Sequence, residues 1–113
     1  MEKCIFCQIA EGKITAKIRF SDKNIIALDD NNPQAPVHIL IIPKKHITNI
    51  NAINQADATL IGQMIFTAGQ LAKKFKISDQ GYRLIFNQGK HSGQLVDHIH
   101  LHLIGGRKLG NIG

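Results

Sequence analysis

Apolar residues along the chain recur with two different periods, which predict short strands and one long helix. From Ala56 to Phe75, apolar residues return at three- and four-residue steps, and Lys73 and Lys74 fall outside that face. A shorter helical pattern runs from Cys4 to Ala10 and stops before Gly12. We therefore expect one principal helix, preceded by a short amino-terminal helix.

The strand patterns lie between and after these helices. Residues Ile18 to Asp30 predict one or two strands with a turn near Ser21 to Asn24. The apolar run from Val37 to Ile42 ends at Pro43, which is typical of a central strand, and it follows a proline-containing loop. Two further strands are expected at Arg83 to Phe86 and at His98 to Ile104. Short strands linked by turns favour an α+β domain with an antiparallel sheet.

Length and composition indicate one globular domain over residues 1–113, without repeats or linkers. No apolar run approaches the ~20 residues that span a bilayer, so we expect no membrane segment. Residues Met1 to Cys4 also lack the apolar core of a signal peptide, which leads us to expect a cytoplasmic location.

The charge balance predicts an anionic partner. Fourteen Lys and Arg against eight Asp and Glu give a net charge of +6. The chain has no Trp and one Tyr, so stacking platforms for bases are scarce and nucleic acid is not the expected partner. A small phosphorylated ligand fits the same charge.

The chemistry concentrates in an alternating histidine segment, His98, His100 and His102. In a strand, this spacing puts three imidazoles on one face and the apolar residues between them on the core face. Each buried ring needs a polar partner, so packing alone does not explain the pattern. The face is suited either to metal binding or to nucleophilic catalysis at phosphorus, with one imidazole attacking and its neighbours supplying protons.

A polar loop, residues 87–94, favours catalysis at phosphorus. Gly89 and Gly93 allow the backbone to approach a phosphate closely. Asn87 and Gln94 add side-chain donors for oxygens that gain charge during the reaction.

With these features in view, the chain resembles the histidine triad family, whose pattern alternates three histidines with apolar residues. The likeness extends over most of the chain. The sequence resembles the Hint branch more than the dinucleoside polyphosphate hydrolases, notably at Gly105-Gly106-Arg107. The matching segments are Phe6 to Ala16, Asp30 to His46, Gly81 to Asn87 and Gly93 to Arg107. The resemblance implies a homodimer with a meander-like antiparallel sheet.

The resemblance also implies a reaction, the hydrolysis of purine nucleoside phosphoramidates through a nucleotidyl-histidine. His100 would attack the α-phosphorus of an AMP or GMP moiety, and His98 would orient it. His102 would contact the phosphate or leaving group, and His38 would complete the proton relay. Asp30 would hold the ribose, and Asn87 the phosphate, with Gln94 in the same loop. The apolar slot for the purine would be formed by Ile5, Phe6, Ile9 and Leu28, which otherwise are simple core residues.

Cys4 and Cys7 have two interpretations. They lack the preceding strand of a redox motif, and they are either packed thiols or metal ligands. Some relatives in the family hold zinc with such a pair and two histidines, which here are His46 and His98. The resemblance thus implies a structural zinc, with no cofactor required for the reaction.

Two positions depart from the Hint pattern, and three functions remain in competition. Leu95 stands where many members have a small polar residue, and Asp97 replaces a frequent aromatic residue. A phosphoramidase is expected, the alternatives being a dinucleoside polyphosphate hydrolase and a nucleotide-binding interaction module with vestigial activity.

Overall fold

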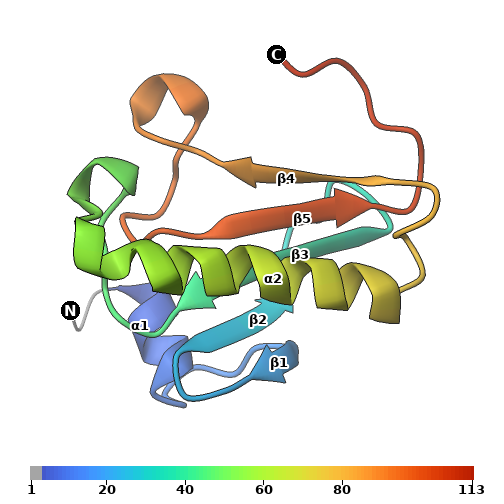
Figure 1. The fold of residues 1–113 in the computed structure, drawn as a ribbon. Helices are drawn as coiled ribbons and strands as arrows, with labels where there is room; N and C mark the ends of the chain where they lie inside the picture. Colours follow the sequence, from blue (N-terminus) through green and yellow to red (C-terminus); the bar gives the residue numbers. More distant parts are fainter. Residues whose placement is uncertain (1–3) are drawn as a thin grey trace.

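The computed structural model describes residues 4–113, which form an antiparallel sheet with helices on both faces (Figure 1). The five strands lie in the order β1-β2-β3-β5-β4. The strands are β1 (Ile18–Ser21), β2 (Ile25–Asp29), β3 (Val37–Pro43), β4 (Tyr82–Phe86) and β5 (Leu101–Gly105). The helices are α1 (Ile5–Ala10) and α2 (Ala58–Lys74), with 3-10 turns at Ile50–Ala52, Gln55–Asp57 and Lys90–Ser92. The predicted α+β class is confirmed. The expectation that the amino terminus carries no signal peptide rests in part on residues 1–3, which lie outside the described residues.

The sheet divides the core into two layers because successive strand residues point to opposite faces. On the face that α2 covers in Figure 1, the buried layer consists of Ile25, Ala27, Ile39, Ile41, Leu101 and Leu103, together with Met64, Ala68, Leu71, Ala72 and Ile77. On the other face, residues of α1 pack on the alternate strand positions, and this layer consists of Phe6, Ile9, Ile26, Leu28, Leu40 and Ile42.

Strand register brings two histidines of the second face together. In the antiparallel pair of β3 and β5, His38 lies opposite Ile104 and Leu40 lies opposite His102. His38 and His102 are therefore diagonal neighbours on one face, within reach of each other's side chains.

Two element boundaries differ from the sequence prediction by two residues or more, whereas the others differ by at most one residue. Strand β5 begins at Leu101 and not at His98, because the Ile99 N–H donates to the Ile47 carbonyl, 2.7 Å away, and not to a neighbouring strand. Helix α2 begins at Ala58 because Gln55–Asp57 form a 3-10 turn, in which the Asp57 carboxylate accepts from the Asn54 N–H and from Lys45.

Within residues 4–113, no helix has the length and apolar character needed to cross a membrane.

Candidate active site and the adjacent thiol-imidazole cluster

A cleft of about 240 Å³ opens on the α1 face of the sheet. Its apolar wall comes from α1 and β2, and its polar wall from β5 and the segments that follow β2 and β4. The residues expected in the nucleotide site that line it are Ile5, Phe6, Ile9, Leu28, Asp30, Asn87, His100 and His102. The structure thus brings a predicted apolar slot and two histidines of the triad to one cavity.

The imidazole of His100 is held by a main-chain group. It is 8% exposed, and its Nδ1 lies 2.8 Å from the His98 carbonyl oxygen. Since a carbonyl oxygen only accepts hydrogen bonds, Nδ1 carries the proton of the neutral ring. The lone pair is therefore on Nε2, as a nucleophile requires.

His38 and His102 adopt the opposite tautomer to His100. The Gln34 N–H donates to Nδ1 of His38 over 3.0 Å, so the proton of the neutral His38 ring is on Nε2. That Nε2 lies 2.9 Å from Nδ1 of His102, which must accept, leaving the proton of His102 on its Nε2. Nε2 of His102 is buried and has no hydrogen-bond partner within the described part of the chain. An unpaired buried donor in a cleft is suited to an oxygen or nitrogen of a bound ligand.

Both rings of this pair are neutral at pH 7. Burial, with the neighbouring His100 and His38 rings, lowers the pKa of His102 to about 4. Burial also lowers the pKa of His38, although the nearby Asp30 carboxylate opposes that shift. A negative charge bound beside the pair would raise both pKa values, because it stabilises the protonated rings.

Asp30 and Asn87 reach the cleft from the ends of neighbouring segments. Asp30 follows β2, accepts from the Asn32 N–H over 2.8 Å, and places its second oxygen 3.3 Å from Nε2 of His38. Asn87 directly follows β4 and is half-buried. The loop after it turns through positive φ at Gly89 (79°) and Gly93 (89°), which explains glycine at both positions.

The side chain of Gln94 was expected to donate to a bound ligand, but the structure gives it another role. Its Oε1 accepts from the Gly89 N–H, and its Nε2 donates to the carbonyls of Thr48 and Val96. The side chain is thereby committed to bracing the loop, and it does not line the cleft. We therefore regard Gln94 as a positioning residue.

The two departures from the family pattern lie in different surroundings. Leu95 lines the cleft and is 92% exposed, an unusual state for a large apolar side chain. Asp97 is exposed and is not among the residues that line the cleft.

The sequence interpretation missed the main-chain groups that orient the rings. The Gln34 N–H holds His38, and the Gln34 carbonyl in turn accepts from Arg107 over 2.7 Å. No residue-type signal marks these groups, since every residue except proline offers the same N–H.

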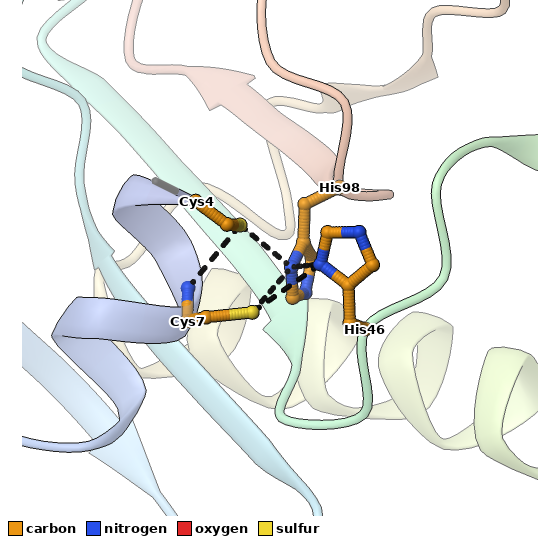
Figure 2. Close-up of side chains that lie close together, drawn as sticks. All are labelled: Cys4, Cys7, His46 and His98. Atoms are coloured by element: carbon orange, nitrogen blue, oxygen red, sulfur yellow. Dashed lines mark hydrogen bonds between the residues drawn. The ribbon is translucent and has the colours of Figure 1, made fainter. Parts of the chain in front are cut away.

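Beside the cleft, four side chains converge (Figure 2). Two come from α1 and its capping residue, one from the segment after β3, and one from the segment before β5. Their donor atoms, Cys4 Sγ, Cys7 Sγ, His46 Nδ1 and His98 Nδ1, lie within 4.8 Å of one another. His98 Nδ1 is 3.3 Å from Cys4 Sγ, 3.5 Å from Cys7 Sγ and 3.1 Å from His46 Nδ1. We call these residues the Cys₂His₂ cluster.

The Cys₂His₂ cluster fits a zinc ion. Ligands around tetrahedral zinc would be separated by about 3.6 Å for nitrogen to sulfur and about 3.3 Å for nitrogen to nitrogen, close to the spacings seen. Nε2 of His98 lies 2.8 Å from the Pro43 carbonyl oxygen, so it carries the proton and Nδ1 presents its lone pair to the cluster. Burial and Cys4 raise the pKa of the Cys7 thiol to about 11, so without a cation it is no reactive thiolate.

A second group of donors does not fit a metal. Asp30, His38 and His102 also place donor atoms within 4.8 Å of one another. Coordination through Nε2 of neutral His38 would move its proton to Nδ1, where it would face the Gln34 N–H. The hydrogen bond from the Gln34 N–H therefore disfavours a metal ion at this group.

Comparison with known proteins assigns this arrangement to a family. The family model described as "Scavenger mRNA decapping enzyme C-term binding" matches residues 3–111. The purine nucleoside phosphoramidase of Escherichia coli (strain K12) is 43% identical over 96% of this chain and 92% of its own length. The chain belongs to the histidine triad family. The resemblance drawn from the sequence is confirmed.

Solved structures of histidine triad proteins agree with the fold. The HIT family hydrolase from Legionella pneumophila Philadelphia 1 has a TM-score of 0.94 and 51% identity, with 96% of each chain covered. A zinc-bound histidine triad family protein from Mycobacterium smegmatis has a TM-score of 0.81 and 27% identity over 94% of this chain and 76% of that one. The chain is therefore related to hydrolases of the histidine triad family in both sequence and fold.

Proposed function

We propose that this histidine triad protein hydrolyses purine nucleoside 5′-phosphoramidates to a nucleoside monophosphate and an amine. One observation carries the proposal, namely the two opposite tautomers that face one cleft. His100 offers a lone pair on Nε2, and His102 offers a proton on Nε2 that no described residue accepts. A nucleophile beside a proton donor is what cleavage of a P–N bond requires.

In the first step, Nε2 of His100 forms a bond to the α-phosphorus while the bond from phosphorus to the amine nitrogen breaks. When a phosphate anion is bound, one additional proton from the solution occupies Nδ1 of His102, and the His38 Nε2–H then donates to the Asp30 carboxylate, 3.3 Å away. His102 gives its Nε2 proton to the departing amine and keeps the proton on Nδ1. The nucleotide is then attached to a cationic imidazole, whose Nδ1–H remains bonded to the His98 carbonyl.

In the second step, water attacks the phosphorus from the side that the amine has left. Neutral His102 accepts a proton from this water, the P–N bond to His100 breaks, and the nucleoside monophosphate leaves. The pair again holds its additional proton, so protons balance over the cycle.

Nucleotide recognition is proposed from the same cleft. The apolar wall of Ile5, Phe6, Ile9 and Leu28 suits a purine, and Asp30 suits the ribose hydroxyls. The E. coli relative, named a purine nucleoside phosphoramidase, supports this choice of substrate.

An assay with two substrates tests the proposal. The protein is incubated with adenosine 5′-phosphoramidate and, separately, with a diadenosine polyphosphate, and AMP release is measured. We expect a higher kcat/KM for the phosphoramidate. Faster cleavage of the diadenosine compound would favour the alternative hydrolase, and AMP binding without release from either would favour the nucleotide-binding module.

We further propose that the Cys₂His₂ cluster holds a structural zinc ion. Four protein ligands leave no position for substrate, so zinc would supply cross-linking and no catalytic chemistry. The donor spacing and the tautomer of His98 support the proposal, as does the zinc-bound relative from Mycobacterium smegmatis.

A further inference from the structure

Helix α1 contributes to the cleft and to the Cys₂His₂ cluster at once. Ile5, Phe6 and Ile9 line the cleft, while Cys7 and the capping residue Cys4 belong to the cluster. The helix has only six residues, so a shift of its cysteines moves the apolar wall of the cleft as well.

Phe6 touches the histidines of both sites. It is buried, and its ring lies edge-on to His98, with centroids 5.8 Å apart, and to His100, with centroids 5.1 Å apart. The His98 ring belongs to the cluster, whereas the His98 carbonyl holds Nδ1 of His100. Two contact routes therefore join the cluster to the nucleophile, one through Phe6 and one through His98.

The helix depends on these contacts for its position. Isolated helices shorter than about 12 residues are marginal in water, and α1 has no acidic residue in its first turn or basic residue in its last. Its amino terminus is capped by the Cys4 sulfur, which accepts from the Cys7 N–H over 3.4 Å. Contacts that hold the sulfurs of Cys4 and Cys7 in place therefore also hold the helix in place.

We propose that closure of the Cys₂His₂ cluster around zinc tightens the binding of a nucleoside monophosphate in the cleft, transmitted by α1 through Phe6. The inference rests on the proposed nucleotide function. Linkage requires reciprocity, so the nucleotide strengthens zinc binding by the same factor. The effect is on binding affinity, because zinc lies outside the reacting atoms.

Calorimetry tests the linkage without measuring turnover. The Kd for AMP is determined for zinc-loaded and zinc-free protein, and zinc affinity is determined with and without AMP by competition with a chromophoric chelator. We expect AMP to bind about tenfold more tightly to the zinc-loaded protein, within the range usual for coupled sites. The chelator experiment should return the same factor.

Three variants identify the route. The double change Cys4→Ser and Cys7→Ser should remove the effect of zinc on the AMP Kd. Phe6→Ala should lower the ratio of the zinc-free to the zinc-loaded AMP Kd well below its wild-type value, because the contact route through the Phe6 ring is lost. Ile9→Ala is the matched control, since Ile9 lies on the same helix, lines the same cleft and is as buried as Phe6; it should weaken AMP binding in both forms and keep the ratio. Phe6→Leu replaces Phe6→Ala if the latter does not fold.

A wild-type ratio below about twofold would overturn the linkage. So would an undiminished ratio in the Phe6 variant, or an equal effect of zinc on the double serine variant. Loss of phosphoramidate hydrolysis with intact AMP binding would count against the proposed function alone, whereas absence of AMP binding in both forms would refute both proposals.

Discussion

Main-chain groups hold the histidines of the cleft and of the Cys₂His₂ cluster and decide which nitrogen of each ring is protonated. The Gln34 N–H fixes His38, the His98 carbonyl fixes His100, and the Pro43 carbonyl fixes His98. A backbone N–H cannot become an acceptor and a carbonyl cannot become a donor. The division between a ring with a free lone pair on Nε2, His100, and a ring with a proton on Nε2, His102, is therefore built into the fold.

Replacement of His100 by alanine or glycine should abolish hydrolysis and leave AMP binding largely intact. The ring supplies the nucleophile, whereas the cleft walls supply the binding surface. We expect a loss of about three orders of magnitude or more in kcat, measured as AMP release, with the AMP Kd changed by less than about threefold. Activity within about tenfold of the wild type would contradict the role of His100.

Leu95→Ser should raise kcat/KM for adenosine 5′-phosphoramidate severalfold. The serine hydroxyl would give the cleft a donor that leucine lacks, at a position where the family often has a small polar residue. Because Leu95 is 92% exposed, the change should alter the free energy of unfolding by less than about 0.5 kcal/mol.

Leu95→Ala is the control, because it removes the same bulk without adding a donor. Equal rates for the serine and alanine variants would show that bulk, and not the missing hydroxyl, limits turnover.

At the residue scale, the sequence predicts side chains better than the groups that orient them. The alternation of His98, His100 and His102 and the Cys4-x-x-Cys7 spacing pointed to residues that the structure brings together. Gln94 was expected to bind phosphate but braces the loop instead, since nothing in its type shows where its amide will point. The residues with a main-chain role, such as Gln34, have no signal in the sequence.

At the scale of elements, the shortest helix is the one most dependent on its surroundings. Helix α1 makes few hydrogen bonds of its own, and it is attached to the rest of the molecule by apolar packing and by the Cys₂His₂ cluster. A metal in the cluster would join α1 to the segment after β3 and to the segment before β5, three parts of the molecule that lie far apart in the chain.

The double change Cys4→Ser and Cys7→Ser should therefore remove zinc and lower thermal stability. Purified wild-type protein should carry about one zinc per subunit by elemental analysis. An unfolded chain does not present four ligands together, so loss of zinc should lower the Tm by roughly 10 °C or more. Metal-free wild-type protein, purified without chelators and equally stable, would show that the cysteines are only packed thiols.

Element boundaries depended on contacts that periodicity does not contain. The long helix and the β3 run were predicted from their apolar patterns, and both exist. The start of β5 was wrong by three residues because alternation extends through His98, whereas ladder pairing does not begin until Leu101. A tertiary bond from Ile99 to Ile47 decides that difference.

At the scale of the whole molecule, one edge of the sheet and one side of α2 remain apolar and exposed. Strand β4 is an edge strand, and its Tyr82 is 38% exposed. A Cβ on Gly69 of α2 would lie 3.9 Å from the Tyr82 hydroxyl, and Ile65, one turn earlier, is 46% exposed. Unpaired edges and apolar patches of this kind favour association.

We expect a homodimer of about twice 12.5 kDa at micromolar concentration, joined through β4 and this side of α2. Ile65→Asp should shift sedimentation toward the monomer. Phe66→Asp is the matched control, because Phe66 is 67% exposed but lines the groove toward Phe20 of β1. A wild-type protein that sediments only as a monomer would contradict the expectation. Dissociation by Phe66→Asp and not by Ile65→Asp would show that the interface lies on the Phe66 side of α2.

Stability should fall as pH drops from 7 to 5. The pKa of His102 is about 4 in the folded protein against 6.5 for an unperturbed histidine, so the unfolded chain binds more protons between these values. Its contribution is complete above about pH 6.5 and is lost toward pH 4. We expect His102 to account for about 1 to 2 kcal/mol of the loss, after allowance for its partial exposure.

Denaturant unfolding at both pH values measures this contribution. His102→Asn should reduce the difference in the free energy of unfolding between pH 7 and pH 5. An unchanged difference would show that other groups cause the pH dependence. His38, whose pKa is also lowered by burial, should contribute to the remainder.

The alternation along β5 also protects the fold against mispairing. Leu101 and Leu103 face the α2 layer, whereas His100 and His102 face the cleft. If β5 paired with β3 one residue out of step, imidazoles would enter the apolar layer and leucines would line the cleft. Each unpaired imidazole in that layer would cost roughly 1 to 3 kcal/mol, which is a large part of the stability of a small domain. The two histidines that line the cleft therefore also disfavour a shifted register of the segment that contains them.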